Sequence, residues 1–211
     1  MITAMDGMPG YVVDCGYLRK LEPWETLQDV TVPEPPRASS RIAPPMPLPE
    51  LRVYGVAIGG KWPSESQVER IRSELRRAPA CVLQQWRDRG CRCEVTPGKL
   101  SANRHPRAGL MRATDGWASR STGLIVIAEQ AGEGTALHEL GHCFDSTNRL
   151  GMTFEWRKIF EENLWNAAFH SYYRENAEEL FAEAFSMYYV SAATRAKLPK
   201  TIRAFIERSV T

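Results

Sequence analysis

Hydrophobic and polar residues follow different patterns before and after residue 50. Residues 31–49 contain seven prolines and show neither helical nor alternating periodicity, which predicts an extended linker. Upstream, residues 11–30 hold enough apolar side chains to form either a segment that docks on a domain or a tail. We therefore assign residues 1–50 to an N-terminal segment with a Pro-rich linker, and residues 51–211 to one folded domain.

Within the second part, short apolar runs come first and helical periodicity comes later. Strands are predicted over residues 51–58, 91–95 and 123–128. The last of them, GLIVIA, is the strongest strand signal in the chain, whereas the Arg- and Gly-rich residues 99–121 are typical of a loop. Helices are predicted to begin at Ser64 and Thr135 and to cover 81–87, 153–170, 175–190 and 199–208. Strands followed by helices indicate an α+β fold with a small mixed sheet.

The composition excludes several classes of protein. The 27 Lys and Arg residues nearly balance 25 Asp and Glu, and a net charge of +2 argues against a nucleic-acid binder that relies on bulk electrostatics. The longest apolar run, Leu124–Ala128, is strand-sized, so we expect no membrane span. Five irregularly spaced cysteines are expected to be reduced thiols. The amino terminus lacks the features of a signal peptide, which predicts a cytoplasmic protein or one exported by a signal-peptide-independent route.

The strongest chemical signal is the sequence H-E-x-x-H at residues 138–142, shortly after a predicted strand and a Gly-containing turn. On a helix, residues four apart lie on one face, so His138 and His142 can bind one metal ion. Glu139 is turned by about 100° from His138, where it can reach a water molecule on the metal and act as a general base. Gly141 is unfavourable inside a helix and indicates close packing of another element.

Two histidines leave a catalytic zinc site incomplete, because such sites use three protein ligands and one open position. The extended metzincin motif would need His at position 148, where this chain has Asn148. The remaining common solution is a Glu from a later helix, and the acidic, amphipathic stretch 172–185 offers Glu178, Glu179 and Glu183. Glu179 and Glu183 share a helix face, so one of them can bind the metal while the other forms hydrogen bonds to a ligand.

The segment HELGHCFD (residues 138–145), followed by EELFAEAF (residues 178–185), resembles the lethal-factor-type zinc metallopeptidases, which are gluzincins. This family includes the catalytic domain of anthrax lethal factor and the bacterial Pro-Pro endopeptidases. The resemblance covers residues 51–211 and leaves out the first fifty residues. It implies a zincin-type metallopeptidase domain in which the H-E-x-x-H helix carries the active site.

The resemblance also implies roles for individual residues. His138, His142 and Glu179 match the zinc ligands of the family, and Glu139 matches its general base. Tyr172, seven positions before Glu179, matches the tyrosine that stabilises the tetrahedral intermediate. A phenol beside the metal could donate a hydrogen bond to the developing oxyanion, which agrees with that role.

Other residues near the motifs are alternatives or supports for these roles. Tyr173 and His170 are close enough in sequence to replace Tyr172 as the oxyanion stabiliser. We expect Glu183 to form hydrogen bonds that steady a metal ligand. Asp145, three residues after the second histidine of the motif, either orients a ligand imidazole or is a solvated helix carboxylate.

In this family the GLIVIA segment, Gly123–Ala128, would be the edge strand along which an extended peptide substrate lies. The same run is also typical of a plain core strand. Together these features predict a monomeric zinc endopeptidase that cleaves extended peptide or protein segments and has no nucleic-acid or membrane partner. The resemblance permits selectivity for Pro-Pro bonds. Two alternatives are a catalytically idle zinc-binding module and a delivered effector or toxin protease with a narrow host-protein substrate.

Overall fold

The computed structural model divides the chain into two compact units, Met1–Met46 and Pro47–Thr211. The residues that it describes are 3–4, 11–14, 17–20, 50–100, 114–166, 169 and 176–210. In the first unit, three short strands form an antiparallel sheet in the order β1 (Thr3–Ala4), β2 (Tyr11–Asp14) and β3 (Tyr17–Lys20). The sequence pattern did not predict these strands.

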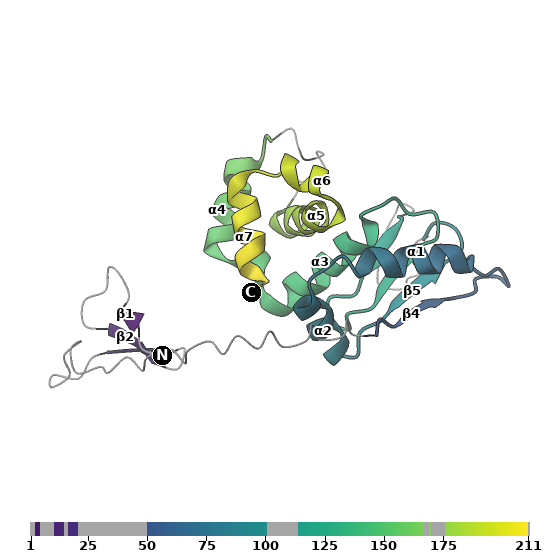
Figure 1. Ribbon diagram of the computed structural model, residues 1–211, viewed down its shortest axis with the longest axis horizontal. Coiled ribbons are helices and arrows are strands. Elements are labelled where there is room, and N and C mark those ends of the chain that lie inside the picture. Colours follow the sequence, from purple (N-terminus) through teal and green to yellow (C-terminus); the bar gives the residue numbers. More distant parts are fainter. Residues whose placement is uncertain are drawn as a thin grey trace, which may run out of the picture. The chain divides into compact units, whose positions relative to one another are not determined.

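The second unit is built on a four-stranded mixed sheet with the order β4-β5-β7-β6 (Figure 1). Its strands are β4 (Val53–Gly55), β5 (Cys93–Thr96), β6 (Gly116–Ala118) and β7 (Ile125–Ala128). Strands β4, β5 and β7 run parallel to one another, and β6 pairs antiparallel with β7. β6 lies inside the stretch for which the sequence predicted a loop. β4 and β7 fall within predicted strands, and β5 extends one residue beyond the predicted 91–95.

The expectation that GLIVIA forms the edge of the sheet is wrong. β7 lies between β5 and β6, and all four of its residues are buried. A continuous apolar run is typical of a strand that is covered on both faces, which explains why this strand gave the strongest signal in the sequence. Among the described strands the edge on this side is β6, whose three residues are too few for a recognisable pattern.

Seven helices accompany this sheet in the described part of the second unit, and α6 is the one that the sequence did not predict. They are α1 (Glu65–Leu75), α2 (Ala80–Asp88), α3 (Thr135–Asn148), α4 (Phe154–Asn163), α5 (Ala177–Val190), α6 (Ala192–Lys197) and α7 (Lys200–Ser209). Ser64 caps the start of α1 as predicted, because its side chain accepts a hydrogen bond from Gln67 N. The combination of this sheet with these helices confirms the α+β fold.

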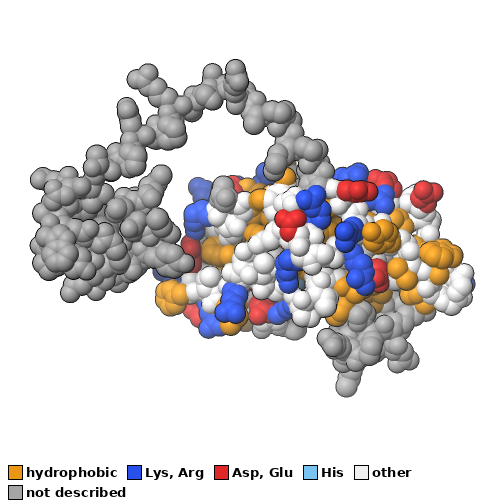
Figure 2. Space-filling model, turned by 90° about the horizontal axis from the view of Figure 1, so that it is seen from below, with side chains coloured by type: hydrophobic (Ala, Val, Ile, Leu, Met, Phe, Trp, Pro, Cys, Tyr) orange, Lys and Arg blue, Asp and Glu red, His pale blue; other side chains and the backbone are white. Residues whose placement is uncertain are grey.

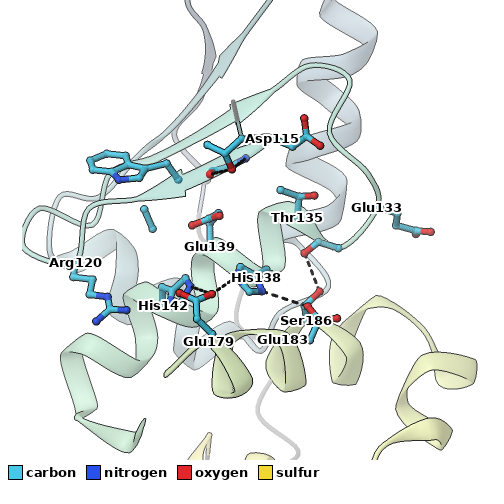
Figure 3. Close-up of a pocket in the computed structure, with 15 residues that line it drawn as sticks. Asp115, Arg120, Glu133, Thr135, His138, Glu139, His142, Glu179, Glu183 and Ser186 are labelled. Atoms are coloured by element: carbon cyan, nitrogen blue, oxygen red, sulfur yellow. Dashed lines mark hydrogen bonds and ion pairs between the residues drawn. The ribbon is translucent and has the colours of Figure 1, made fainter. Parts of the chain in front are cut away.

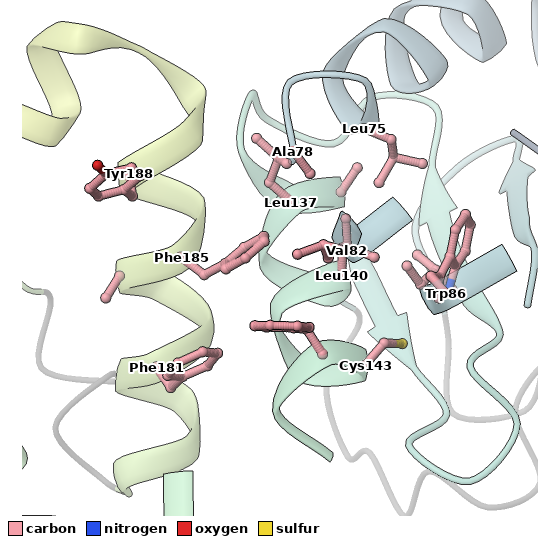
Figure 4. Close-up of a cluster of buried hydrophobic side chains, with 14 of the residues drawn as sticks. Leu75, Ala78, Val82, Trp86, Leu137, Leu140, Cys143, Phe181, Phe185 and Tyr188 are labelled. Carbon is pink, nitrogen blue, oxygen red and sulfur yellow. The ribbon is translucent and has the colours of Figure 1, made fainter. Parts of the chain in front are cut away.

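Helix α3 is central to the second unit, because it lies between the sheet and the group formed by α4, α5, α6 and α7 (Figure 1). Leu137 and Leu140 of α3 are fully buried and share one core with Phe181 and Phe185 of α5 (Figure 4). A Cβ atom on Gly141 would lie 3.0 Å from the backbone Cα of Ala182. The close packing indicated by this glycine is therefore the contact between α3 and α5.

The described surface that faces the viewer in Figure 2 carries charges of both signs. On the face shown in Figure 2, Lys and Arg side chains are interspersed with acidic and uncharged ones. Arg72 in α1 and Arg76 directly after it both form ion pairs with Glu69, and the next residue, Arg77, forms one with Glu133. Of the helices in the described ranges, none is long and apolar enough to cross a membrane.

Candidate metal centre and catalytic groove

Helix α3 presents the H-E-x-x-H motif to a groove on the surface of the second unit. His138 and His142 lie one turn apart, with ring centroids separated by 4.8 Å and ring planes at 86°. Glu139 is buried beside β6, where a Cβ atom on Gly116 would lie only 2.8 Å from its Oε1 atom. At Gly116 the strand therefore approaches α3 too closely to leave room for a side chain.

Helix α5 brings carboxylates to the same place (Figure 3). Asn176 caps the start of this helix, because its side chain accepts a hydrogen bond from Glu179 N at 2.8 Å. Glu179 Oε2 lies 3.4 Å from Nε2 of both histidines, and Glu183 Oε2 lies 3.4 Å from His138 Nδ1. Of the three glutamates that the sequence offered, Glu178 points elsewhere and forms an ion pair with Arg120.

The cluster of His138, His142 and Glu179 fits a metal ion. Its donor atoms all lie within 4.8 Å of one another. Ligands at about 2.1 Å from a tetrahedral ion are about 3.4 Å apart, which agrees with the two distances from Glu179 to the imidazoles. Apart from these imidazoles, the buried Glu179 Oε2 has no partner among the described residues. Such an oxygen is costly to bury unless a cation satisfies it.

The charges in the cluster shift the pKa values of its members. Burial lowers the pKa of His138, but the carboxylates of Glu179 and Glu183 outweigh this effect and raise it to about 9. Burial raises the pKa of Glu179, and the two imidazoles more than reverse this and hold it well below its usual range. Burial raises the pKa of Glu139, and the nearby histidines offset only part of that rise. Glu139 is therefore a stronger proton acceptor than an exposed glutamate.

A groove of about 660 Å³ surrounds this cluster (Figure 3). β6 lines one wall of the groove. The first turns of α3 and the side of α5 that faces the H-E-x-x-H motif line the other walls. Arg120, in the turn between β6 and β7, contributes a cation to the lining, and its pairing with Glu178 links that turn to α5. Sequence reasoning missed Arg120 and Gly116, because neither belongs to a motif and β6 itself gave no signal.

Asp145 takes neither of the roles that the sequence left open. It is 4% exposed, so it is not a solvated carboxylate. Its Oδ1 atom accepts a hydrogen bond from Gly151 N at 2.5 Å, whereas His142 Nδ1 has no hydrogen-bond partner in the described part of the chain. Asp145 therefore fixes the short 3₁₀ helix Leu150–Met152 that follows α3.

Three residues of the sequence prediction lie outside the described residues. They are Tyr172 and its two alternatives, Tyr173 and His170. The role of oxyanion stabiliser therefore stays a prediction for this group. The structure does place the expected support for His138, because Glu183 contacts the Nδ1 atom of that ring.

Comparisons with known proteins agree with this geometry. Residues 118–203 match the family described as anthrax toxin lethal factor, N- and C-terminal domain. The structure of the Pro-Pro endopeptidase PPEP-2 from Paenibacillus alvei is similar, with a TM-score of 0.56 and 21% sequence identity over 73% of this chain and 94% of that one. No curated protein matches the sequence significantly. Together, the match to this family over residues 118–203, the similar fold and the clustered His-His-Glu donors indicate a metalloendopeptidase that is similar to the lethal-factor family.

Proposed function

We propose that the chain is a zinc endopeptidase in which His138, His142 and Glu179 hold the metal. The observation that carries the assignment is the position of Glu179 Oε2, which is buried 3.4 Å from both imidazole Nε2 atoms. Two imidazoles and one carboxylate are a common donor set for catalytic zinc. When bound, zinc supplies Lewis acidity toward a peptide carbonyl and a water molecule.

Glu139 is the proposed general base. It accepts a proton from the attacking water and later delivers that proton to the leaving amine. Its burial supports this role, because burial raises the pKa of the carboxyl toward neutral pH and so makes the carboxylate a stronger base. Tyr172 is proposed to donate a hydrogen bond to the oxyanion, on the resemblance alone.

The proposed substrate is an extended peptide that pairs with β6. Ser119 N bonds to Leu124 O, and Ala128 N bonds to Asp115 O. Because bonded and non-bonded pairs alternate in an antiparallel ladder, the backbone groups of Gly116 and Ala118 point away from β7. Gly116 and Ala118 both line the groove. Gly116 O already accepts a hydrogen bond from Thr114 Oγ1, so the backbone groups of Ala118 are the ones proposed to pair with an added peptide strand.

We also propose that Pro-Pro bonds are among the accepted substrates. The support is the likeness to a solved Pro-Pro endopeptidase and the resemblance of the motifs. Proline has no backbone N–H, so the two prolines themselves can pair with β6 only through their carbonyl oxygens.

A fluorogenic peptide library with Pro-Pro members tests the function, with Glu139→Ala run in parallel. We expect cleavage that a chelator stops, that zinc restores and that Glu139→Ala reduces at least 100-fold. Metal analysis is the control, because the variant should bind zinc as the wild type does. Zinc-loaded wild type that cleaves nothing would instead favour the idle zinc-binding module. Full activity of Glu139→Ala would contradict the mechanism.

A further inference from the structure

The start of the metal-binding helix lacks a cap of its own. The first helical N–H groups of any helix have no intrahelical partner, and a side chain at the N-cap position usually satisfies one of them. In α3 that position is Gly134, with a φ angle of 96°. A Cβ atom there would lie 2.8 Å from Ser186 Oγ, which donates a hydrogen bond to Gly134 O. Packing against α5 therefore leaves no room for a capping side chain.

Glu74 of α1 satisfies these N–H groups from a distant part of the sequence. Its side chain is 2% exposed, and its Oε1 atom accepts hydrogen bonds from Ala136 N at 2.8 Å and Leu137 N at 3.2 Å. The next amide, His138 N, is the first to bond within the helix, to Gly134 O. The second amide that the buried carboxylate binds, Leu137 N, therefore belongs to the residue immediately before His138, the first proposed metal ligand.

Arg70, one turn earlier on α1, holds the chain that leads into α3. Its guanidinium donates hydrogen bonds to the carbonyl oxygens of Glu129 and Ala131, each at 3.0 Å. It also lies 3.9 Å from Glu74 Oε2. One face of α1 therefore fixes both the connection after β7 and the first turn of α3. A carboxylate at this end of a helix also interacts favourably with the helix dipole.

We propose that Glu74, supported by Arg70, is a positioning residue for the metal centre. It sets the axial position and rotation of the first turn of α3, and hence where His138 and Glu139 stand relative to Glu179. Because α1 contributes no residue to the groove lining, its effect passes through the helix backbone alone. The proposal rests on the proposed metal-binding function.

Cobalt substitution tests the proposal without relying on activity. The visible absorption of bound Co²⁺ reports the geometry of its ligands. For Glu74→Ala we expect an altered Co²⁺ spectrum, zinc affinity lowered roughly 10-fold or more in chelator competition, and a fall in kcat with little change in KM. Glu74→Gln keeps an oxygen acceptor for the two amides, so it should recover most of the wild-type spectrum.

A matched variant separates positioning from simple loss of stability. Thr153 caps α4 by accepting a hydrogen bond from Trp156 N, and it does not line the groove. Thr153→Ala should lower thermal stability without changing the Co²⁺ spectrum, zinc affinity or kcat. If Glu74→Ala merely lowers stability in the same way, the proposal is overturned.

Two further measurements keep the test decisive. If Glu74→Ala does not fold, Arg70→Ala carries the test, since this partly exposed side chain can be removed with less disruption. Arg70→Ala should also alter the Co²⁺ spectrum and lower the affinity for zinc. A spectrum and a zinc affinity like those of the wild type would overturn the role of α1. Absence of any peptidase activity in the wild type would count against the proposed function, while the cobalt and zinc measurements would still decide the role of Glu74.

Discussion

At the scale of single residues, the catalytic carboxylate depends on the absence of a side chain beside it. We expect Gly116→Ala to lower kcat by roughly 10-fold or more, because its Cβ would displace Glu139 Oε1 from 2.8 Å away. Gly132→Ala is the control, since a Cβ at that position meets nothing within 4 Å. Steady-state kinetics on both variants would contradict this explanation if they lose activity equally, or if neither does.

A second prediction at this scale concerns the proton held by His138 when no metal is bound. Its pKa is raised from 6.5 to about 9 in the folded protein, so its contribution to stability is complete below pH 6.5 and is lost as the pH rises through about 9. Chelator-treated wild type should therefore lose thermal stability over that pH range relative to His138→Gln. Melting curves at several pH values measure the difference. If the difference in unfolding temperature between the two proteins stays constant with pH, this proton does not contribute to stability.

At the scale of elements, the contact between α3 and α5 sets the separation of the proposed ligands. Replacing a helical glycine by alanine ordinarily stabilises a helix by up to about 1 kcal/mol. We expect Gly141→Ala to destabilise the protein instead, by about 1–3 kcal/mol, because the added methyl would meet the backbone of Ala182 at 3.0 Å. Urea unfolding measures the change in stability, and zinc competition measures whether the separation of the ligands has changed. A more stable variant with unchanged zinc affinity would show that the two helices can separate freely.

The sequence was sufficient to predict those elements that have a strong period or a motif. β7, α3 and α5 were found because an apolar run, H-E-x-x-H and an acidic amphipathic stretch each mark them. β6 has three residues, and its position at the edge depends on pairing with a distant strand, which local pattern does not encode. The edge position of the apolar run was implied by the family resemblance alone, and in the structure that position belongs to β6.

The candidate site shows the same division between local and long-range information. Helical spacing predicted that His138 and His142 share a face, and the structure brings both together with Glu179. Spacing alone could not choose between Glu179 and Glu183, since both lie on one face of α5. That choice depends on how α5 packs on α3. The cap from Glu74 was equally invisible, because it joins residues more than sixty positions apart.

At the scale of the whole molecule, metal binding and folding should be linked. The proposed ligands come from α3 and α5, so an ion that binds them stabilises the folded state in which these helices are packed. A zinc concentration 1,000 times the dissociation constant would add about 4 kcal/mol to the free energy of unfolding. Calorimetry with and without a chelator measures this difference, and His142→Ala should abolish most of it. Equal unfolding temperatures with and without zinc would contradict the linkage.

The short edge strand has a consequence for which parts of a target protein can be cut. If a peptide pairs with β6 as proposed, it must offer backbone groups that its own fold does not already use. Segments inside helices and sheets do not meet this condition, whereas termini and connections between domains do. Cleavage would then depend as much on how readily a target opens locally as on its residues. A well-folded protein that carries a suitable sequence should resist cleavage until heat or a truncation loosens that region.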